Sequence, residues 1–175
     1  MSVYGQKIPG IEYPVVNERA VRATAGIMFL IGAFVFSYTF YTKDYTFMYI
    51  VVPLFWTDFF LKAVFAPKYS IFGFVGRLLV RNQKPEYVGA LQKRFAWSIG
   101  LMMASLMMIF AIGMGIRGAL PMTICSICLS FMWMETALGV CVGCKIYGYL
   151  LRKGIIAEPA VRPACPGGAC SVGKK

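Results

Sequence analysis

The chain has 175 residues, of which 59% are hydrophobic and only 14% charged, and its formal net charge is +11. This composition, with a mean hydropathy of +0.68, argues against a soluble globular domain and predicts a small integral membrane protein. The cations lie between long apolar runs rather than on one polar face, so the expected partner is the lipid bilayer and not nucleic acid. The absence of histidine excludes His-bound zinc, bis-His haem and His-based acid/base catalysis.

Two apolar segments near the N-terminus predict the first two membrane spans. Residues 23–41 carry no charge and are long enough to cross a bilayer core about 30 Å thick. A signal peptide is the alternative, but two acidic residues precede this segment and no small-residue cleavage site follows it. Residues 45–65 form the second predicted span, in which Pro53 is tolerated as a kink. The charged residues of this span, Asp58 and Lys62, are one helical turn apart.

A shorter apolar segment separates the first pair of spans from the second pair. Residues 69–80 contain Arg77 and have a cation at each end, which is typical of a short helix lying in the membrane interface. A helical continuation of the second span is the alternative. The third and fourth spans are expected over residues 95–116 and 119–140, and the only charge in the fourth is Glu135.

The distribution of cations predicts the topology of the chain. Fifteen of the 18 Lys and Arg residues lie before the first span, between the second and third, or after the fourth, and the two short opposite loops hold only Lys43 and Arg117. The positive-inside rule therefore predicts that both termini are cytoplasmic. The expected organisation is a cytoplasmic segment over 1–22, an all-α membrane domain over 23–152, and a flexible, Pro/Gly-rich tail over 153–175.

An internal repeat relates the second span to the fourth. The Trp, acidic, Leu and Lys positions coincide in a gapless alignment, which places Trp56, Asp58, Leu61 and Lys68 on Trp133, Glu135, Leu138 and Lys145. The openings of the first and third spans, residues 22–27 and 94–99, are also alike. The pattern predicts two parallel-repeat helical hairpins related by a pseudo-two-fold axis along the membrane normal. Chance similarity between apolar helices is the alternative.

The intramembrane charges are candidate functional residues. If the repeat is real, Asp58 and Glu135 lie at equivalent depths and face one another across the bundle axis. A charge inside the bilayer costs about 2.5 to 3.5 kcal/mol on insertion scales, so these carboxylates should be paired or should line a polar path. Lys62, four residues from Asp58, is the expected partner. Either a structural ion pair or a proton-transfer role is compatible with this pattern.

The six cysteines form three pairs, which are Cys125 with Cys128, Cys141 with Cys144, and Cys165 with Cys170. In the first two pairs the spacing of three places both sulfur atoms on one helix face, where they suit a disulfide, a soft metal ion or a sulfur species. The first pair lies inside the fourth span, so it is expected to pack there and is a weak candidate for a metal site. No cofactor is predicted, and a soft metal ion is the alternative.

Cys141 and Cys144 are the strongest candidates, because Gly139 and Gly143 interrupt the helix where it reaches the interface. If the helix breaks there and restarts at Lys145, the helix dipole and that lysine both favour the thiolate. If the helix continues without a break, the dipole at its C-terminal end opposes ionisation. Only the first arrangement predicts a reactive pair.

The third pair of cysteines lies on the predicted flexible tail. Cys165 is 21 residues beyond Cys144, which is enough chain for Cys165 and Cys170 to reach Cys141 and Cys144 on the same membrane face. One fixed and one mobile dithiol would form an exchange relay. In the reducing cytoplasm, paired cysteines serve catalysis or metal binding more often than structure.

Three motifs carry a family resemblance, namely Asn17-Glu18-Arg19, Ala66-Pro67-Lys68 and Gly139-Val140-Cys141-Val142-Gly143-Cys144-Lys145-Ile146-Tyr147. Over about residues 15–152 the chain resembles the bacterial membrane family catalogued as domain of unknown function 4395. The resemblance implies a small inner-membrane protein with the Cys pair near the end of its last helix, and a loose association with sulfurtransferases and thioredoxin-like proteins, but no particular reaction. Cys125, Cys128, Cys165 and Cys170 depart from the family pattern.

Three functions are compatible with these features. The leading hypothesis is a four-span protein whose Cys141 and Cys144 handle thiol, disulfide or persulfide sulfur at the cytoplasmic face. The partner would be a thioredoxin-like or sulfurtransferase protein. The second hypothesis is an accessory subunit of a larger membrane complex, in which the cysteines are incidental. The third is a transporter of a soft metal ion or small sulfur species, with Asp58, Lys62 and Glu135 lining a polar route.

Overall fold

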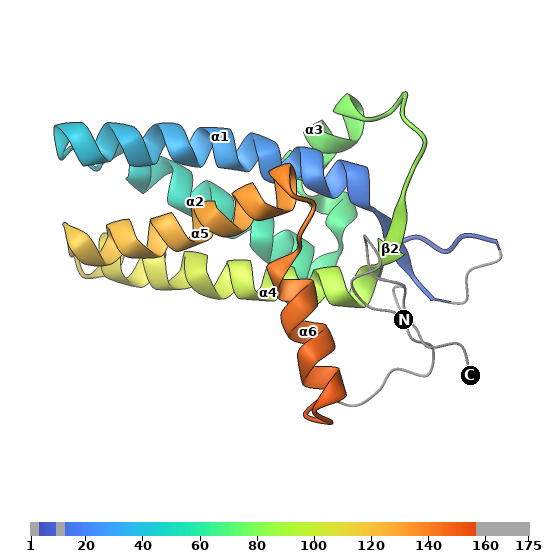
Figure 1. Cartoon of the computed structure of the whole chain (residues 1–175). Coiled ribbons are helices and arrows are strands. Elements are labelled where there is room, and N and C mark those ends of the chain that lie inside the picture. The colour runs from blue at the N-terminus through green and yellow to red at the C-terminus, as the bar shows by residue number, and fades with distance from the viewer. Residues whose placement is uncertain (1–3, 10–12, 157–175) are drawn as a thin grey trace.

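The structure is a computed structural model that describes residues 4–9 and 13–156. Four long helices form a bundle, and two short helices and a two-stranded ribbon gather at one end of it (Figure 1). The described elements run in the order β1 (Val15–Asn17), α1 (Glu18–Thr42), α2 (Thr46–Phe60), a π-helical turn (Leu61–Phe65), a 3-10 turn (Pro67–Tyr69), α3 (Ile71–Leu79), β2 (Tyr87–Gly89), α4 (Ala90–Met107), a second π-helical turn (Met108–Gly113), α5 (Ala119–Ala137) and α6 (Val142–Arg152).

The predicted all-α fold with four membrane-spanning helices is confirmed. Four helical segments are long and apolar enough to cross a membrane, and these are Glu18–Thr42, Thr46–Phe65, Ala90–Gly113 and Ala119–Ala137. Several boundaries differ from the prediction. α1 and α4 begin at Glu18 and Ala90 rather than at 23 and 95, and the third span ends at Gly113 rather than at 116. The predicted starts of the first and third spans lie directly after the last charged residues that precede them, Arg22 and Arg94. The helices begin earlier because charged side chains of their first turns form ion pairs within the fold.

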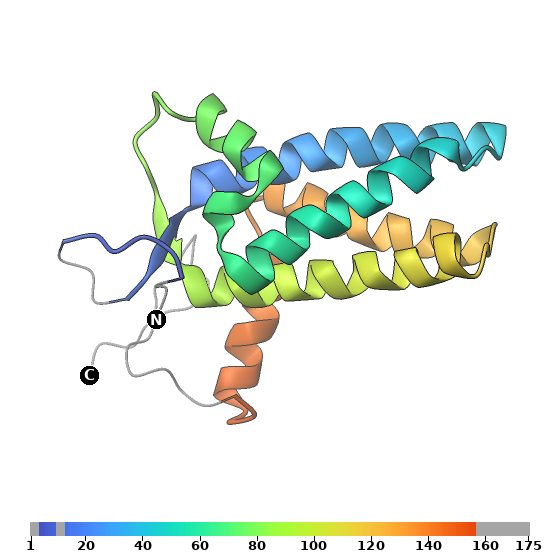
Figure 2. The same cartoon turned by 180° about the vertical axis from the view of Figure 1, so that it is seen from behind.

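The short strands join the starts of α1 and α4. β1 and β2 pair antiparallel, with Val16 opposite Val88. The ribbon, α3 and α6 lie at the same end of the bundle, whereas the short connections between α1 and α2 and between α4 and α5 lie at the opposite end (Figures 1 and 2). The segments that precede the first span and link the second to the third therefore share one end, as the cation distribution predicts.

The predicted interfacial helix is a separate element, α3, and not a continuation of α2. Ser70 caps it, since its hydroxyl accepts the N–H of Gly73 at 2.7 Å. α3 packs against α1, and at Gly76 the two helices are so close that an added Cβ would lie 2.3 Å from Oγ1 of Thr24. Several large apolar side chains face outward from α3, among them Phe74 and Leu79, each 63% exposed. This amphipathic surface suits a helix at a membrane interface.

α6 occupies an equivalent position on the other hairpin. It packs against α4, and at Gly143 an added Cβ would lie 2.6 Å from Cα of Ala96. Figure 1 shows α6 running across the long direction of the bundle rather than along it. The fourth span therefore ends at Ala137, before the predicted end at residue 140, and the chain continues in a separate helix.

The helix contacts follow the symmetry that the internal repeat predicts. α1 packs on α5 and α3, and α4 correspondingly packs on α2 and α6. Exchanging the unit β1–α1–α2–α3 with the unit β2–α4–α5–α6 leaves this set of contacts unchanged. An antiparallel pair of equivalent strands is also what a two-fold axis requires. These contacts support two parallel-repeat hairpins and add one short helix to each.

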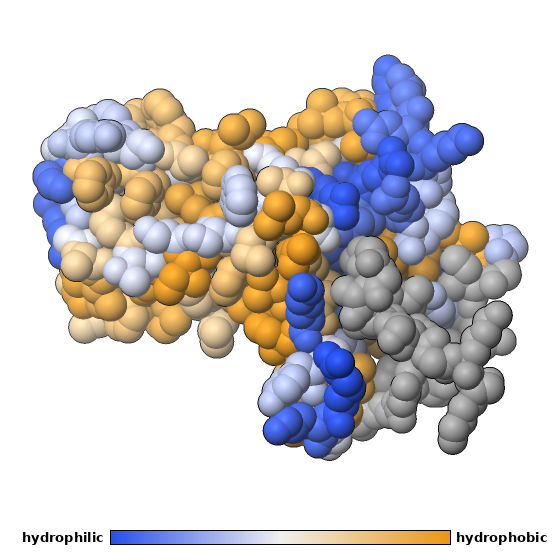
Figure 3. Space-filling view, in the orientation of Figure 1, coloured by the Kyte–Doolittle hydropathy of each residue, from blue (hydrophilic) through white to orange (hydrophobic). Residues whose placement is uncertain are grey.

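The surface of the bundle is apolar over most of its length. Figure 3 shows hydrophobic colour along the long helices and hydrophilic colour concentrated near β2 and on α6, with a smaller hydrophilic area at the far end. Large side chains such as Leu30 and Phe34 are 69% and 63% exposed. Contiguous apolar surface of this extent suits contact with lipid. The chain is thus a multi-pass membrane protein by the length and composition of its helices.

Candidate functional site

A break between α5 and α6 positions the Cys141–Cys144 pair. α5 ends at Ala137, and Gly139 follows with a left-handed φ of +64°. α6 then begins at Val142 with Cys141 as its N-cap. The helix therefore breaks at the glycine, as the reactive arrangement requires, although it restarts at Val142 rather than at Lys145. Both thiols lie at the N-terminal end of a helix of 11 residues, where the dipole favours negative charge.

Gly139 also lies directly against Arg22 of α1. An added Cβ at this position would be 1.9 Å from Nη2 of Arg22, and the same guanidinium donates to the Gly139 carbonyl at 3.5 Å. Glycine is thus required here both by the backbone conformation and by the close approach of α1.

Replacing Gly139 with alanine is expected to lower the unfolding temperature and to displace α6. A left-handed conformation costs a non-glycine residue about 1 to 2 kcal/mol, and the added methyl group would also collide with Arg22. Thermal unfolding of the purified protein measures the effect. Gly115→Ala is the matched control, because Gly115 has φ +63° but no atom within 4 Å of an added Cβ. Equal losses in the two variants would show that the Arg22 contact contributes nothing.

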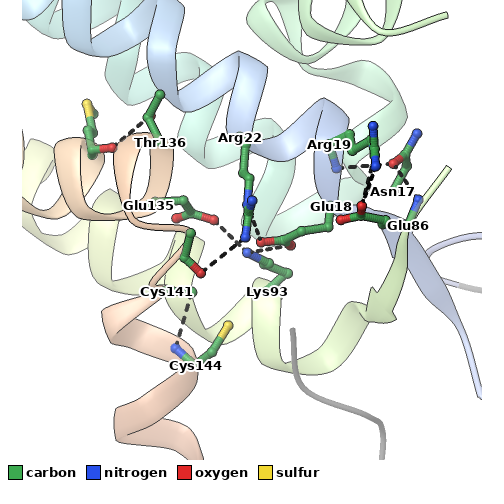
Figure 4. A network of polar contacts seen from close by, with 12 residues as sticks. Asn17, Glu18, Arg19, Arg22, Glu86, Lys93, Glu135, Thr136, Cys141 and Cys144 are labelled. Carbon is green, nitrogen blue, oxygen red and sulfur yellow. Dashed lines mark hydrogen bonds and ion pairs between the residues drawn. The ribbon is translucent and has the colours of Figure 1, made fainter. Parts of the chain in front are cut away.

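The two thiols are buried and have different environments. Cys141 is 5% exposed and Cys144 4% exposed, and both are free thiols. The backbone N–H of Cys144 donates to Sγ of Cys141 at 3.3 Å, so the Cys141 sulfur replaces the oxygen that usually caps a helix. Figure 4 shows Cys141 at the start of α6 with Cys144 one turn further on.

A cluster of charged residues lies beside this pair, in which Glu18 and Lys93 are buried and Glu135 and Arg22 are partly exposed. Nζ of Lys93 is 2.8 Å from Oε2 of Glu18 and 2.5 Å from Oε1 of Glu135. Nε of Arg22 is 3.5 Å from Oε1 of Glu18. The four residues come from α1, α4 and α5, and they point toward one another and toward Cys141 (Figure 4). Two cations and two carboxylates balance, which is the condition for keeping charges in a buried site.

These surroundings set the ionisation of the two thiols in opposite directions. The hydrogen bond from the Cys144 thiol is the largest influence on Cys141 and lowers its pKa. Lys93 and the backbone N–H of Cys144 also lower this pKa, whereas burial and the charge of Glu135 raise it. The same thiol hydrogen bond, together with burial, raises the pKa of Cys144. The arrangement therefore favours ionisation of Cys141 over ionisation of Cys144.

The predicted pairing of Asp58 with Lys62 is confirmed, with 2.5 Å between Oδ2 and Nζ. Oδ1 of Asp58 accepts hydrogen bonds from the Ser70 hydroxyl at 2.7 Å and from the backbone N–H of Phe72 at 3.1 Å. Because these partners belong to the start of α3, the carboxylate links α2 to α3. Glu135 has a different partner, Lys93, so each of the two carboxylates is paired with its own lysine.

Lys93 and Glu18 are site residues that sequence reasoning missed. Both lie outside the predicted span boundaries and were grouped with the flanking polar residues. In the structure they are each 1% exposed. The sequence offered one weak signal, the motif in which Glu18 directly follows Asn17, the N-cap of α1. An acidic residue is typical of the first turn of a helix, so its presence there does not by itself indicate burial.

The two halves of the fold contain equivalent caps with different chemistry. Ser70 caps α3 by accepting the N–H three residues later, and Cys141 caps α6 in the same way. Each cap lies after a helix that carries an acidic residue paired with a lysine, the buried Asp58 in one half and the partly buried Glu135 in the other. The hydroxyl of the first half is thus replaced by a thiol in the second.

A cavity of about 370 Å³ lies between the four long helices at the end of the bundle that holds the caps. Its wall includes the polar residues Lys62, Glu135 and Cys141. Lys68 and Arg77 also line it, and the rest of the wall is formed mainly by small and aliphatic residues, with a few larger side chains such as Met28, Phe59 and Trp97. Cys141 is therefore itself largely buried but contributes to the wall of this cavity.

The remaining cysteines lie elsewhere or outside the description. Cys125 and Cys128 are partly buried free thiols within α5, and Cys128 reaches the cavity wall. Cys165 and Cys170 lie outside the described residues. Within residues 4–9 and 13–156, no three side chains of His, Cys, Asp or Glu come together as a metal site.

Comparison with known proteins identifies a family. The sequence model of the family described as "Domain of unknown function (DUF4395)" matches residues 16–152. The chain belongs to this family. The DUF4395 match, which confirms the resemblance seen in the sequence, covers both hairpins, the buried charge cluster and Cys141 with Cys144, and it ends before the tail pair. No curated protein and no solved structure matches this DUF4395 chain.

Proposed function

We propose that this DUF4395 protein carries out thiol–disulfide exchange through Cys141 and Cys144. Cys141 is the nucleophile and Cys144 the thiol that resolves the mixed disulfide. The observation that carries the proposal is the asymmetry of the pair, in which the Cys141 sulfur caps α6 and accepts the Cys144 N–H beside the Lys93 cluster. A pair that only filled space would not need a cap position, a neighbouring cation and a helix break together.

The exchange proceeds in two displacement steps. The Cys141 thiolate attacks one sulfur of a substrate disulfide, an S–S bond forms between them, and the other substrate sulfur leaves as a thiolate. Cys144 then loses its proton and attacks Sγ of Cys141. The mixed disulfide breaks, the Cys141–Cys144 disulfide forms, and the substrate leaves with both of its sulfurs reduced. Run in reverse, the same steps oxidise a substrate dithiol. Glu135, which influences both thiols electrostatically, is the proposed acceptor of the Cys144 proton.

Cys165 and Cys170 are the proposed exchange partner within the chain. The nine residues from 157 to 165 span up to about 30 Å when extended. α6, at 11 residues, is about 16 Å long. The tail is therefore long enough to return from the end of α6 to Cys141 at its start. A thioredoxin-like or sulfurtransferase protein would then exchange disulfide or persulfide sulfur with the tail pair.

The proposed location is the bacterial cytoplasmic membrane, with both termini in the cytoplasm. The support is the excess of cations in the segments that precede the first span and link the second to the third. These segments lie at the same end of the bundle as α6 (Figure 1), whose N-cap is Cys141. The Cys141–Cys144 pair would thus lie near the cytoplasmic surface of the membrane.

The proposal is tested by the pH dependence of Cys141 alkylation in protein whose other pairs, Cys125/Cys128 and Cys165/Cys170, are replaced by serine. Because the pKa of Cys141 is lowered, we expect the half-maximal rate below about pH 8.5, the midpoint of a free cysteine, with the rate falling as the pH falls through that lowered value. Replacing Cys144 with alanine removes the largest lowering influence and should move the midpoint upward.

Trapping provides the control for this experiment. In the same background, Cys144→Ala should accumulate a mixed disulfide with cystamine at Cys141, because the resolving thiol is gone. Cys141→Ala should accumulate none, since the remaining thiol has a raised pKa. Equal trapping by the two single variants would contradict the assigned roles, and no trapping by either would overturn the proposed function.

A further inference from the structure

The internal cavity carries an excess of positive charge. Lys68 and Arg77 line its wall, and within the part of the chain that the structure describes neither has a carboxylate at ion-pair distance. Lys62 and Glu135 also line the wall, and each of these is paired with a residue of opposite charge. The cavity therefore has two cations on its wall that no described carboxylate neutralises.

The contacts of the two unpaired cations position them without cancelling their charge. The guanidinium of Arg77 donates to the carbonyls of Pro67 and Lys68, each at 3.1 Å. A guanidinium has more N–H groups than these two hydrogen bonds use, so it can still bind an anion. Nζ of Lys68 lies 4.7 Å from the centre of the Tyr69 ring, a contact that likewise leaves the ammonium charged.

The unpaired cations and the reactive thiol share this cavity. Cys141 lines the same wall. Lys62 interacts electrostatically with both Arg77 and Glu135, and Glu135 in turn interacts with Cys141. A continuous series of interacting groups thus joins the positive part of the wall to the thiol. A molecule that enters the cavity to reach Cys141 is therefore exposed to the field of the two cations.

The space around Cys141 limits the size of what can reach it. The residue is 5% exposed, and the cavity volume of about 370 Å³ is near the lower end of the range of small-molecule sites, roughly 300 to 1,000 Å³. A low-molecular-weight disulfide fits such a space, whereas a disulfide within a folded domain does not. The mainly small and aliphatic wall is also a low-dielectric surrounding, in which charges act more strongly than in water.

From these observations we propose that the disulfide that reaches Cys141 through the cavity is a small molecule with negatively charged groups. A low-dielectric cleft lined by charges of one sign concentrates ligands of the opposite sign and raises their association rate about 10- to 1,000-fold. This inference rests on the proposed function and names the substrate class of its dithiol.

Both halves of the small disulfide are reduced in the exchange. The Cys141 thiolate attacks one sulfur, an S–S bond forms to that half, and the other half leaves as a thiolate. Cys144 then loses its proton and attacks Sγ of Cys141, which releases the first half. The cysteines give up two electrons and two protons, and the substrate takes up both as it becomes two thiols. Because the attacking thiolate itself repels an anionic substrate, the two unpaired cations are needed to offset this repulsion.

The test compares three small disulfides that differ in charge, which are the anionic dithiodipropionate, the neutral bis(hydroxyethyl) disulfide and the cationic cystamine. The full chain carries Cys144→Ala, with the other two cysteine pairs replaced by serine, in nanodiscs of phosphatidylcholine, which adds no net charge. The rate of mixed-disulfide formation at Cys141 is measured by mass spectrometry. Each rate is divided by the rate of the same reagent with the neutral thiol N-acetylcysteinamide, which removes differences in intrinsic reactivity.

We expect the normalised rate of dithiodipropionate to exceed that of the neutral disulfide about tenfold or more at low ionic strength. Cystamine should react most slowly, although it still reacts. The preference for the anion should decrease as salt is added, because salt screens the charges. The salt series needs no substitution in α3, so it tests the proposal even if a variant of Arg77 does not fold.

Two double variants locate the charges that cause the preference. Lys68→Gln with Arg77→Gln removes both unpaired cations, so dithiodipropionate should lose its advantage over the neutral disulfide. Arg81→Gln with Lys84→Gln is the matched control, because it removes the same charge from exposed residues at the same end of the bundle that are not part of the cavity wall. The control should keep the preference.

The outcomes separate this inference from the proposed function. Equal normalised rates for the three reagents, a preference that salt does not change, or an equal loss in the two double variants would overturn the anionic substrate. The proposed function would still stand, since a mixed disulfide forms at Cys141 in each of these cases. If none of the three reagents forms a mixed disulfide there, the proposed function fails as well.

Discussion

Replacing Lys93 with methionine is expected to destabilise the protein by about 3 to 5 kcal/mol, the usual cost of removing one partner from a buried ion pair. Lys93 is 1% exposed and is within 2.8 Å of Glu18 and 2.5 Å of Glu135. Without it, two carboxylates from α1 and α5 would lie together in the bundle with only the partly exposed Arg22 to compensate them. Thermal unfolding in detergent, followed by circular dichroism, measures the loss.

A triple variant separates the structural from the chemical role of Lys93. Neutralising all three members, as Lys93→Met with Glu18→Gln and Glu135→Gln, removes the charge imbalance and should recover most of the lost stability. The pKa of Cys141 has opposing contributions from Lys93, which lowers it, and Glu135, which raises it. The alkylation midpoint should therefore change little in the triple variant but rise in Lys93→Met alone. A Lys93→Met protein as stable as the wild type would contradict the burial of this cluster.

Replacing Asp58 with leucine is the second large effect, also about 3 to 5 kcal/mol. Asp58 is fully buried, and it pairs with Lys62, itself 4% exposed. The substitution leaves the Lys62 ammonium without a counter-charge, and it removes the acceptor for the Ser70 hydroxyl and the Phe72 N–H. Both the α2–α3 connection and the pairing of the lysine are lost. The midpoint of thermal unfolding reports the sum.

The double variant Asp58→Leu with Lys62→Met is the matched control. Removing both charges eliminates the unpaired ammonium, so the double variant should be more stable than Asp58→Leu alone. The stability that the double variant still lacks relative to the wild type measures the hydrogen bonds of Asp58 to Ser70 and Phe72 at the start of α3. If the single and double variants unfold at the same temperature, the ion pair contributes nothing and the carboxylate acts only through α3.

The fold was predictable in its main features because lipid imposes simple rules. Predominantly apolar segments of about 20 residues must be helices if they cross the bilayer, and this rule located all four spans. The helix ends were less predictable. α1 and α4 begin within the charged flanking segments, because Glu18 and Lys93 form ion pairs with residues of other helices. Partners that are distant in the sequence cannot be identified from the local residue pattern.

The site was predictable where its signal is local. The glycines around Cys141 indicated that the helix could break there, although the sequence left a continuous helix open as the alternative and placed the restart at Lys145 rather than at Val142. The pairing of Asp58 with Lys62 follows from their spacing on one helix. The partner of Glu135 is 42 residues away in the sequence, and it is brought close only by the packing of α4 near α5. Long-range pairing of this kind depends on the whole bundle and leaves no spacing signal.

The equivalence of Ser70 and Cys141 gives the molecule an internal reference. Two capped helices on related hairpins differ in the capping atom, which is oxygen on one side and sulfur on the other. A change in lipid, temperature or detergent that loosens the scaffold should affect both caps alike, whereas a change in redox conditions should be felt only at the sulfur. Comparing the two halves of one chain, by amide exchange at Gly73 and at Cys144, therefore distinguishes a response of the chemistry from a response of the fold.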